Sequence, residues 1–290
     1  MAVAATGFFD GVHLGHRQVL NTLLREAGSR GEESMVVTFW PHPRTVLQDD
    51  ARRLRLLNSL SEKKDLLLAS GLQRVEVLDF TKEFSRMDSE RYLTMLRDSF
   101  GVSAVVLGYD NRIGSDLLLP EDSAAIARSL GMDAVIVPPV PVGEGDAAIS
   151  STKIRTALCE GLVDRAAAML GYTYMLHGVV VAGNRLGRTI GFPTANMQLY
   201  EPLKQLPGNG VYCVDVQVLG SRFKGMCNIG VRPTVGGGAI TIETNIFDFD
   251  EDIYGLDIRL SFLRKIRDEK LFGSLSELRS QLESDRSVCM

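Results

Sequence analysis

The stretch "TGFFDGVHLGH", residues 6–16, follows a short apolar run and holds three glycines and two of the four histidines of the chain. Glycine tolerates positive φ and close backbone approach, so this stretch indicates a tight turn from a strand into a helix. His13 and His16 are three residues apart and share one face of that helix. The first turn of a helix offers unpaired N–H groups and a positive dipole end. We therefore expect an anion site here, with a pair of surface histidines beside a turn as the alternative.

Around this turn, valine-rich runs alternate with segments of helical period up to about residue 168. The expected strands are residues 3–6, 35–39, 74–80, 104–110 and 133–140. The helical segments between them end at Gly28, Gly71, Gly101 and Gly131. One last helix is expected to run from residue 152 to Gly171. This alternation predicts a parallel sheet with helices on both faces, whose ligands bind at the carboxyl ends of the strands.

The second part of the chain has a different period. Apolar Tyr212, Val214 and Val216 alternate strictly with Cys213, Asp215 and Gln217. Such alternation is typical of antiparallel strands with one face in water. Turn signals at residues 207–210 and 236–238 separate the strands, and residues 274–285 form an amphipathic helical pattern. We expect a small antiparallel β-barrel with a C-terminal helix, and two domains at residues 1–168 and 169–290.

Composition narrows the classes of partner. A net charge of -4 and a pI near 5.7 give no basic field for nucleic acid or an anionic membrane. We therefore expect small-molecule partners, and the sequence leaves a homo-oligomer open. The four cysteines show no metal-binding spacing, and no apolar segment is long enough to span a bilayer. These features predict reduced thiols and a cytoplasmic location.

A second anion-binding pattern is "ISSTKIR", residues 149–155. Ser150, Ser151 and Thr152 precede a helix, where they could serve only as N-caps. Lys153 and Arg155 lie in its first turn. Cations there oppose the helix dipole unless an external anion compensates, which favours a bound phosphate.

Six motifs occur in an order that resembles one enzyme family. They are "GFFDGVHLGH", "TFWPHPR", "GYDNRIG", "ISSTKIR", "GRTIGFPTAN" and "IETNIFDF". Together they resemble the bacterial bifunctional riboflavin kinase/FMN adenylyltransferase, also called FAD synthetase. The resemblance implies a Rossmann-like nucleotidylyltransferase sheet followed by a riboflavin kinase barrel. It implies phosphorylation of riboflavin to FMN by ATP, then adenylylation of FMN to FAD with release of pyrophosphate, with Mg²⁺ as cofactor.

Adenylylation joins the FMN phosphate to the α-phosphorus of ATP, and this phosphate is already anionic. The reaction needs positioned charge donors rather than a base. The resemblance implies catalytic roles for His13, His16 and Arg155. Beside these three, it implies that ATP contacts come from Gly7, Phe8, Phe9, Asp10, Gly11, Ser151 and Thr152. It implies that the flavin is bound by Asp110, Asn111 and Arg112.

Phosphorylation of riboflavin differs because the nucleophile is a neutral ribityl hydroxyl, for which a general base helps. Glu243 is the candidate, since it points away from the face that carries Ile242 and Thr244. A solvent-facing carboxylate is the alternative.

The loop at residues 183–196 lacks the Walker A spacing. Its glycines, Gly183, Gly187 and Gly191, could wrap ATP, or they could simply form a tight turn. Thr194 and Asn196 offer hard oxygen ligands for Mg²⁺. Arg267 and Phe272 resemble the flavin-side residues of the family, although Arg267 could also be an exposed arginine at a helix edge.

The chain departs from the family pattern at three places. It begins close to its first motif, so we expect a shortened first strand and a disturbed sheet edge. Asn111 and Ile113 stand where the family has bulkier residues, which predicts weaker flavin packing than ATP binding in the first domain. Asn245 replaces a frequent histidine, a change that we expect to be tolerated because Glu243 is kept.

Two other functions fit parts of the sequence. The protein could be a nucleotidyltransferase for another phosphomonoester with a regulatory barrel, but such a barrel would not need "GFPTAN" and Glu243. It could also be a flavin-storage or sensor protein without catalysis. The presence of His13, His16, Thr194, Asn196 and Glu243 argues against this second alternative.

Overall fold

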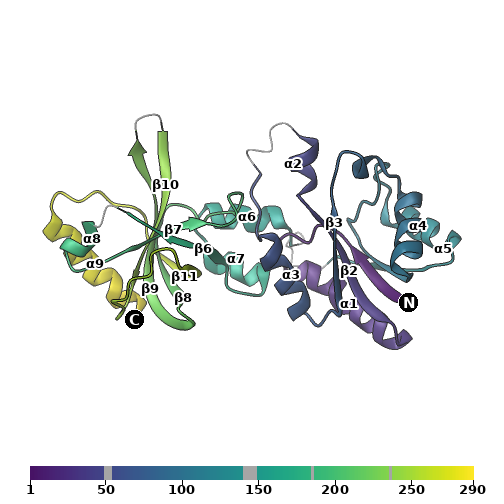
Figure 1. Cartoon of the computed structure of the whole chain (residues 1–290), viewed down its shortest axis with the longest axis horizontal. Coiled ribbons are helices and arrows are strands. Elements are labelled where there is room, and N and C mark those ends of the chain that lie inside the picture. Colours follow the sequence, from purple (N-terminus) through teal and green to yellow (C-terminus); the bar gives the residue numbers. More distant parts are fainter. Residues whose placement is uncertain (49–53, 140–148, 184–185, 235–236) are drawn as a thin grey trace. The chain divides into compact units, whose positions relative to one another are not determined.

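The computed structural model describes residues 1–48, 54–139, 149–183, 186–234 and 237–290, and forms two compact units, Met1–Ser151 and Thr152–Met290 (Figure 1). The sequence placed this boundary after residue 168. The difference arises because α7 (Val163–Leu170) packs on β11 (Asp257–Arg267) of the barrel. Within the described residues, no helix is both long and apolar enough to cross a membrane.

The first unit, here called the sheet unit, has a parallel sheet in the order β3-β2-β1-β4-β5. Its strands are β1 (Ala2–Thr6), β2 (Glu33–Trp40), β3 (Arg74–Asp79), β4 (Val102–Gly108) and β5 (Asp133–Val137). This confirms the predicted architecture. The disturbed edge expected for the first strand is wrong, because β1 lies at the centre of the sheet and pairs with both β2 and β4.

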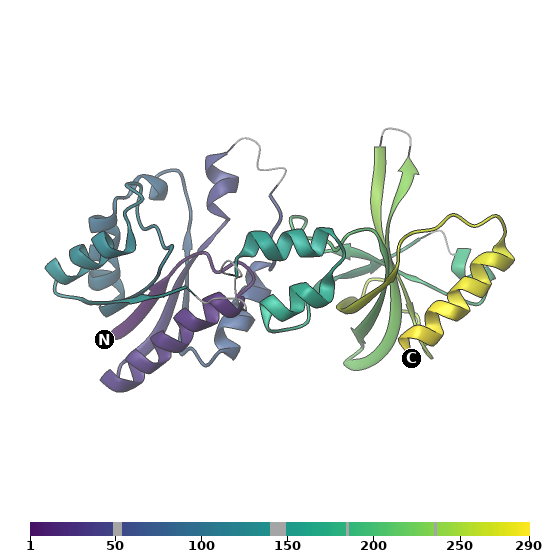
Figure 2. The same cartoon turned by 180° about the vertical axis from the view of Figure 1, so that it is seen from behind.

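Helices cover both faces of this sheet (Figures 1 and 2). Leu20 and Leu23 of α1 (Leu14–Arg30) and Leu67 of α3 (Leu60–Ala69) pack in one core, and the other face holds α4 (Ser89–Phe100) and α5 (Pro120–Ser129). The short helices α2 (Pro43–Leu47) and η2 (Phe84–Arg86) complete the unit. Helix α1 runs past the predicted end at Gly28 and stops at Gly31, whose φ of 64° provides the left-handed cap.

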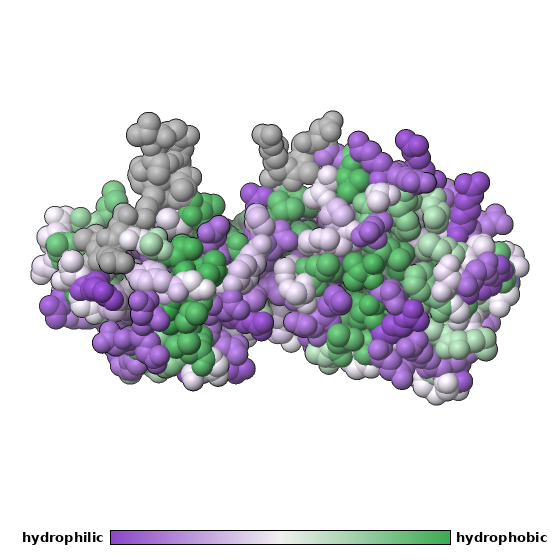
Figure 3. Space-filling model, viewed as in Figure 1, coloured by the Kyte–Doolittle hydropathy of each residue, from purple (hydrophilic) through white to green (hydrophobic). Residues whose placement is uncertain are grey.

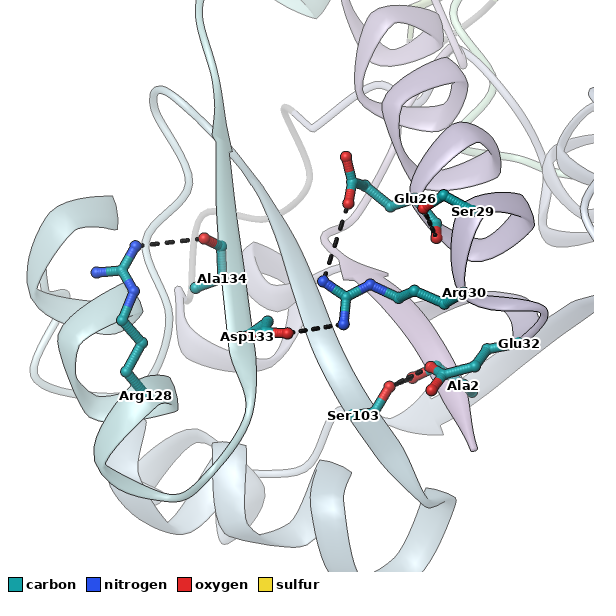
Figure 4. Close-up of polar contacts among 9 residues, drawn as sticks. All are labelled: Ala2, Glu26, Ser29, Arg30, Glu32, Ser103, Arg128, Asp133 and Ala134. Atoms are coloured by element: carbon teal, nitrogen blue, oxygen red, sulfur yellow. Dashed lines mark hydrogen bonds and ion pairs between the residues drawn. The ribbon is translucent and has the colours of Figure 1, made fainter.

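Polar contacts close the sheet at the amino ends of its strands (Figure 4). Arg30, the last residue of α1, donates to Asp133 at the start of β5 over 2.7 Å. Ser103 near the start of β4 bonds Glu32, which precedes β2. This edge is therefore bonded within the protein, and the carboxyl ends of the strands are left for ligands.

The helix predicted from residue 152 to Gly171 is divided in two. Helix α6 (Ser151–Cys159) and helix α7 are joined by a bend at Gly161, which has a φ of 77°. A Cβ at Gly161 would lie 2.8 Å from Tyr212 Oη, so only glycine fits without a shift. The bend lets α7 pack on β11 while the end of α6 bonds Gly208.

The second unit, here called the barrel unit, is a closed antiparallel barrel in the order β10-β7-β6-β11-β8-β9, as predicted. The strands preceding β11 are β6 (Met175–Val181), β7 (Ala195–Leu199), β8 (Gly210–Val218), β9 (Ser221–Thr234) and β10 (Gly237–Ile246). Helix α8 (Leu186–Thr189) follows β6, and α9 (Leu275–Cys289) ends the chain. Val214, Val216 and Phe262 are among the residues that fill the interior.

Helix α9 covers part of the barrel surface, so the predicted wet face is dry there. Val211, Cys213, Met226 and Phe247 form a second apolar cluster beneath it. Cys213 also forms a disulfide with Cys289, 76 residues away. This bond contradicts the expected reduced thiols. The sequence did not predict this disulfide, because only the folded structure brings β8 and the end of α9 together.

Candidate active sites

The turn between β1 and α1 is buried and conformationally unusual. Phe9 and Val12 have φ values of 54° and 38°, and Gly11 between them has 87°. A non-glycine residue in this region costs about 1–3 kcal/mol and persists only where its surroundings hold it. Such strain is concentrated at functional sites, which supports the predicted role of the turn.

Asp10 anchors this turn. Its buried carboxylate accepts hydrogen bonds from the backbone N–H groups of Leu57, at 2.9 Å, and Asn58, at 3.3 Å. Ser151 Oγ donates to the Asp10 carbonyl oxygen over 2.9 Å. Asp10 thus holds the turn against the chain before α3, and its predicted direct contact with ATP stays a prediction.

His13 and His16 lie face to face at the start of α1. His13 is the N-cap, and its Nδ1 accepts from the His16 backbone N–H over 3.2 Å. This bond leaves the proton of a neutral His13 ring on Nε2. The two rings stack with centroids 3.6 Å apart. Both predicted histidines therefore present their rings at one helix N-terminus.

The environment keeps His16 neutral. Burial first, and then the charges of His13 and Lys63, hold the pKa of His16 well below its usual value. Its Nδ1 is buried and has no hydrogen-bond partner among the described residues. A buried polar atom without a partner is costly, so this atom points to a ligand.

The segment after β4 differs from its expected role. Asn111 Nδ2 donates to the Thr6 carbonyl oxygen at the end of β1 over 2.7 Å. Ile113 is 4% exposed and packs in a core cluster of the sheet unit. Ile113 is therefore a core residue, and the expected weaker flavin packing and the flavin contact of Asn111 stay predictions. Asp110 and Arg112 are exposed, and their flavin contacts stay predictions.

Two of the predicted nucleotide ligands do not belong to the sheet unit. Thr152 and Arg155 are at the start of α6 and belong to the second compact unit. Their approach to the histidines stays a prediction.

In the barrel unit, a cavity of about 280 Å³ collects most of the predicted kinase residues. Five of those predicted from the sequence line it: Gly187, Thr194, Glu243, Arg267 and Phe272. It also holds Asn228 and Asn245, which the sequence did not single out as ligands. Glu243 on β10 stands opposite Asn196 on β7 and Asn228 on β9, so strand pairing fixes the position of its carboxylate.

The glycines of the loop before β7 are needed for packing within the protein. A Cβ at Gly183 would lie 2.1 Å from Asn196 Nδ2, and one at Gly187 would lie 2.1 Å from the Phe192 carbonyl oxygen. At Gly187 the clash is with backbone and leaves no room for a side chain, whereas at Gly183 the Asn196 amide would have to move. Gly191 adopts a φ of 84°, which also favours glycine. Gly183 thus lies directly beside Asn196, and the wrapping of ATP by this loop stays a prediction.

Arg267 is positioned by the C-terminal helix. Its Nε and Nη2 donate to Asp285, with the shortest distance 2.8 Å, and Asp285 is 1% exposed. Its guanidinium lies 5.7 Å from the Phe272 ring centre. The alternative of an exposed arginine at a helix edge is wrong, because Arg267 ends strand β11 and its side chain is 20% exposed.

Thr194 also lines a second, smaller cavity on the barrel unit. This cavity is bounded by Arg188, Tyr254 and the acidic residues of positions 250–252. Thr194 therefore stands where the two cavities meet. Among the described residues no group of three or more His, Cys, Asp or Glu could hold a metal ion. A cation here would have to use hydroxyl and amide oxygens together with ligands from a substrate.

The fold and these sites define a nucleotide-dependent transferase with two active units. A family model described as FAD synthetase matches residues 1–153, and one described as riboflavin kinase matches residues 170–290. The chain belongs to the family of bifunctional riboflavin kinase/FMN adenylyltransferases. Two curated members are those of Bacillus subtilis (strain 168), 34% identical, and Escherichia coli (strain K12), 36% identical. Each alignment covers 98% of this chain and 90% of the relative.

A solved structure shares the fold over the whole chain. It is described as a macrolide-efflux protein from Streptococcus pneumoniae, with a TM-score of 0.91 and 32% sequence identity. The match covers 99% of this chain and 93% of that one. The efflux name concerns that protein and is not carried over to this chain.

Proposed function

We propose that the barrel unit phosphorylates riboflavin with ATP and that the sheet unit then adenylylates the resulting FMN to FAD. The observation that supports this proposal is that Glu243, Thr194, Arg267 and Phe272 all line the larger cavity of the barrel unit. These four residues come from three separate segments of the chain, at Thr194, Glu243 and residues 267–272, and would not need to converge in a barrel with only a regulatory role.

In the kinase step, the ribityl hydroxyl attacks the γ-phosphorus of ATP. Its O–H proton passes to the Glu243 carboxylate as the new O–P bond forms, and ADP leaves. Strand pairing with β7 and β9 holds that carboxylate at the cavity wall. Thr194, which lines both cavities, is placed to contact the phosphoryl group between nucleotide and flavin.

Mg²⁺ fits the oxygen donors beside this position. Thr194 supplies a hydroxyl and Asn196 an amide oxygen, which are hard ligands of the kind that Mg²⁺ uses along with waters and phosphates. When bound, Mg²⁺ would neutralise charge on the phosphates. The close approach of Gly183 to Asn196 leaves this amide little free space on that side.

The flavin is assigned to the larger cavity, on the side of α9. Leu278 and Leu282 from this helix supply an apolar wall. The Phe272 ring offers a surface for stacking an aromatic ring system. Arg267, held by Asp285, supplies a fixed cation for the carbonyl side of the flavin.

In the adenylylation step, an FMN phosphate oxygen attacks the α-phosphorus of ATP and pyrophosphate leaves. The N–H groups at the start of α1 and the Nε2–H of His13 are donors for the charge on the reacting phosphates. His16 is kept neutral in the absence of the anion, which suits a hydrogen-bonding role. We assign further charge to Arg155 and a hydroxyl contact to Thr152.

The substrates are small molecules, and we place both reactions in the cytoplasm, where ATP is supplied.

On the face that Figure 3 shows, apolar residues gather over the middle of the sheet unit and along the barrel, between hydrophilic ones. Self-association through such areas stays a prediction that size-exclusion chromatography with light scattering would test.

The proposal is tested by incubating the protein with riboflavin, ATP and Mg²⁺ and separating the flavins by chromatography. FMN should accumulate first and FAD should follow, and supplied FMN should give FAD without riboflavin. Formation of neither flavin by the folded protein would contradict the proposal. Formation of FMN alone would remove the role assigned to the sheet unit.

A further inference from the structure

Lys63 is the most deeply buried lysine near the turn that carries the histidines. It lies on α3 and is 1% exposed. Its Nζ donates to the Phe8 carbonyl oxygen at 3.0 Å, Thr38 Oγ1 at 3.0 Å and the Phe39 carbonyl oxygen at 3.3 Å. These three acceptors use the full donor capacity of the ammonium group.

One of the three Lys63 bonds reaches Phe8 directly, and a second reaches Thr38, which itself bonds Phe8. The Phe8 carbonyl oxygen also accepts from Thr38 Oγ1 over 3.1 Å, so two donors hold one acceptor. The ammonium lies 3.8 Å from the centre of the Phe8 ring as well. Phe8 is thereby fixed by both its backbone and its side chain, directly before the left-handed residue Phe9.

A buried ammonium is costly to maintain, and an apolar side chain of similar length would fill the same space without that cost. Lys63 is held by carbonyl and hydroxyl groups of β2 and of Phe8, and Phe8 is one of the residues predicted to contact ATP.

We propose that Lys63 is a positioning residue for adenylylation, which holds Phe8 and so sets the turn that brings His13 and His16 to ATP. This role rests on the function proposed for the sheet unit. Lys63 acts through the turn, whereas the histidines contact the phosphates.

Electrostatics supports the same role. Burial lowers the pKa of Lys63 to about 8, against the opposing charge of Asp10. The ammonium in turn helps to lower the pKa of His16. The titratable groups around it are Asp10 and His16, with His42 beside the Phe8 ring at 4.2 Å. Below pH 8 the protonated lysine thus both holds the turn and favours a neutral His16.

The test compares Lys63→Met and Lys63→Arg with Lys64→Met, an exposed neighbour on the same helix. Misplacement of donors by about 1 Å costs on the order of 10²-fold in rate. We expect Lys63→Met to lower kcat for adenylylation of supplied FMN by about 10- to 100-fold, with a smaller change in KM for ATP. Lys63→Arg should recover part of the loss, and Lys64→Met should match the unmodified protein. Riboflavin phosphorylation in the same molecules serves as the internal control and should not change.

A pH profile separates positioning from a purely structural role. In the unmodified protein, kcat/KM for adenylylation should fall as pH rises through about 8, where Lys63 loses its proton. Lys63→Met should lack this fall, and Lys63→Arg should stay charged across the range. Circular dichroism melting reports whether each variant is folded; the centre of the Trp40 ring lies 5.6 Å from the Lys63 ammonium, so its fluorescence would respond to the substitution itself.

Unchanged adenylylation in a folded Lys63→Met protein would overturn the positioning role. If this variant fails to fold, a flat profile through pH 8 in the unmodified protein would overturn it. Neither result would touch the proposed function, which fails only if the unmodified protein makes no FAD from FMN.

Discussion

The hydrogen bond from the His16 backbone to His13 Nδ1 determines how both histidines can act. It makes Nε2 the donor of a neutral His13, while burial keeps His16 neutral before a phosphate arrives. Two stacked rings that are both charged would repel each other, so the pair is suited to donate hydrogen bonds to an anion. The pair therefore fits the charge stabilisation proposed for the sheet unit better than proton removal.

Replacing His13 and His16 together by alanine should lower the rate of FAD formation from FMN by at least about 10²–10³-fold, the typical cost of losing a preorganised donor. FMN formation should be nearly unchanged because the kinase residues lie on the barrel unit. His177→Ala on β6 is the matched control and should preserve both rates. Equal loss of both activities in the folded double variant would contradict the division of labour.

Glu243→Gln should stop riboflavin phosphorylation while supplied FMN is still converted to FAD. Only the ribityl hydroxyl has a proton to lose, and a positioned base contributes about 10²–10⁴-fold. Glutamine keeps the size and strand register of the residue. The rate should be measured with riboflavin at saturation, beside Glu283→Gln on the exposed side of α9 as control. More than about a tenth of the original kinase rate would mean that phosphoryl transfer here needs little help from a base.

Helix α9 forms one wall of the larger cavity of the barrel unit. It contributes Leu278 and Leu282 to the lining, and Asp285 to the position of Arg267. The disulfide from Cys289 to Cys213 ties the last turn of this helix to strand β8. The cavity is therefore complete only while α9 stays on the barrel.

Cys289→Ser should destabilise the barrel unit by about 2–4 kcal/mol, the usual effect of losing a disulfide that closes a long loop. It should also raise KM for riboflavin several-fold, because the helix that carries Leu278 and Asp285 is held less firmly. A dithiol reductant reduces the bond between Cys213 and Cys289 and is itself oxidised to a disulfide. It should have the same two effects on the unmodified protein.

Denaturant unfolding and riboflavin kinetics measure these two effects, with adenylylation of FMN as the internal control. Cys159→Ser, which changes an exposed free thiol, should have no effect on either. Identical stability and KM in Cys289→Ser and the unmodified protein would show that α9 is held without the bond.

The two units meet in sequence at residues 151 and 152, so a separate kinase fragment of the whole molecule must include helices α6 and α7. Helices α6 and α7 join the barrel: Gly208 N–H donates to the Leu158 carbonyl oxygen over 2.7 Å, and α7 packs on β11. A fragment that begins at residue 169 would lose these contacts and expose the apolar surface beneath them.

We expect a fragment of residues 152–290 to fold and to convert riboflavin to FMN, while residues 169–290 should unfold at a lower temperature. Val163 and Ala166 are fully buried in the intact protein, and the longer fragment keeps them. Circular dichroism melting and kinase assays of both fragments test this. Equal melting temperatures would show that α6 and α7 add nothing to the barrel.

Much of the fold could be predicted because it depends on local periodicity. Valine runs separated by glycine-ended helices identify the parallel sheet, and strict alternation around Tyr212 identifies the barrel. The helix ends were predicted less well. Gly28 continues α1 and Gly161 breaks a helix, because tertiary contacts decide which glycine adopts a positive φ.

The sequence by itself determined the chemistry of the candidate sites, since the spacing of His13 and His16 and the position of Glu243 on an alternating strand follow from helix and strand geometry. Only the tertiary structure decided which distant residues support them. Lys63 reaches Phe8 across 55 positions, Asp285 reaches Arg267 across 18, and Cys213 meets Cys289 across 76. Local patterns carry no signal for such pairs, because they form only where packing brings two elements together. For the same physical reason, only the tertiary structure shows that Ile113 packs in the core of the sheet unit.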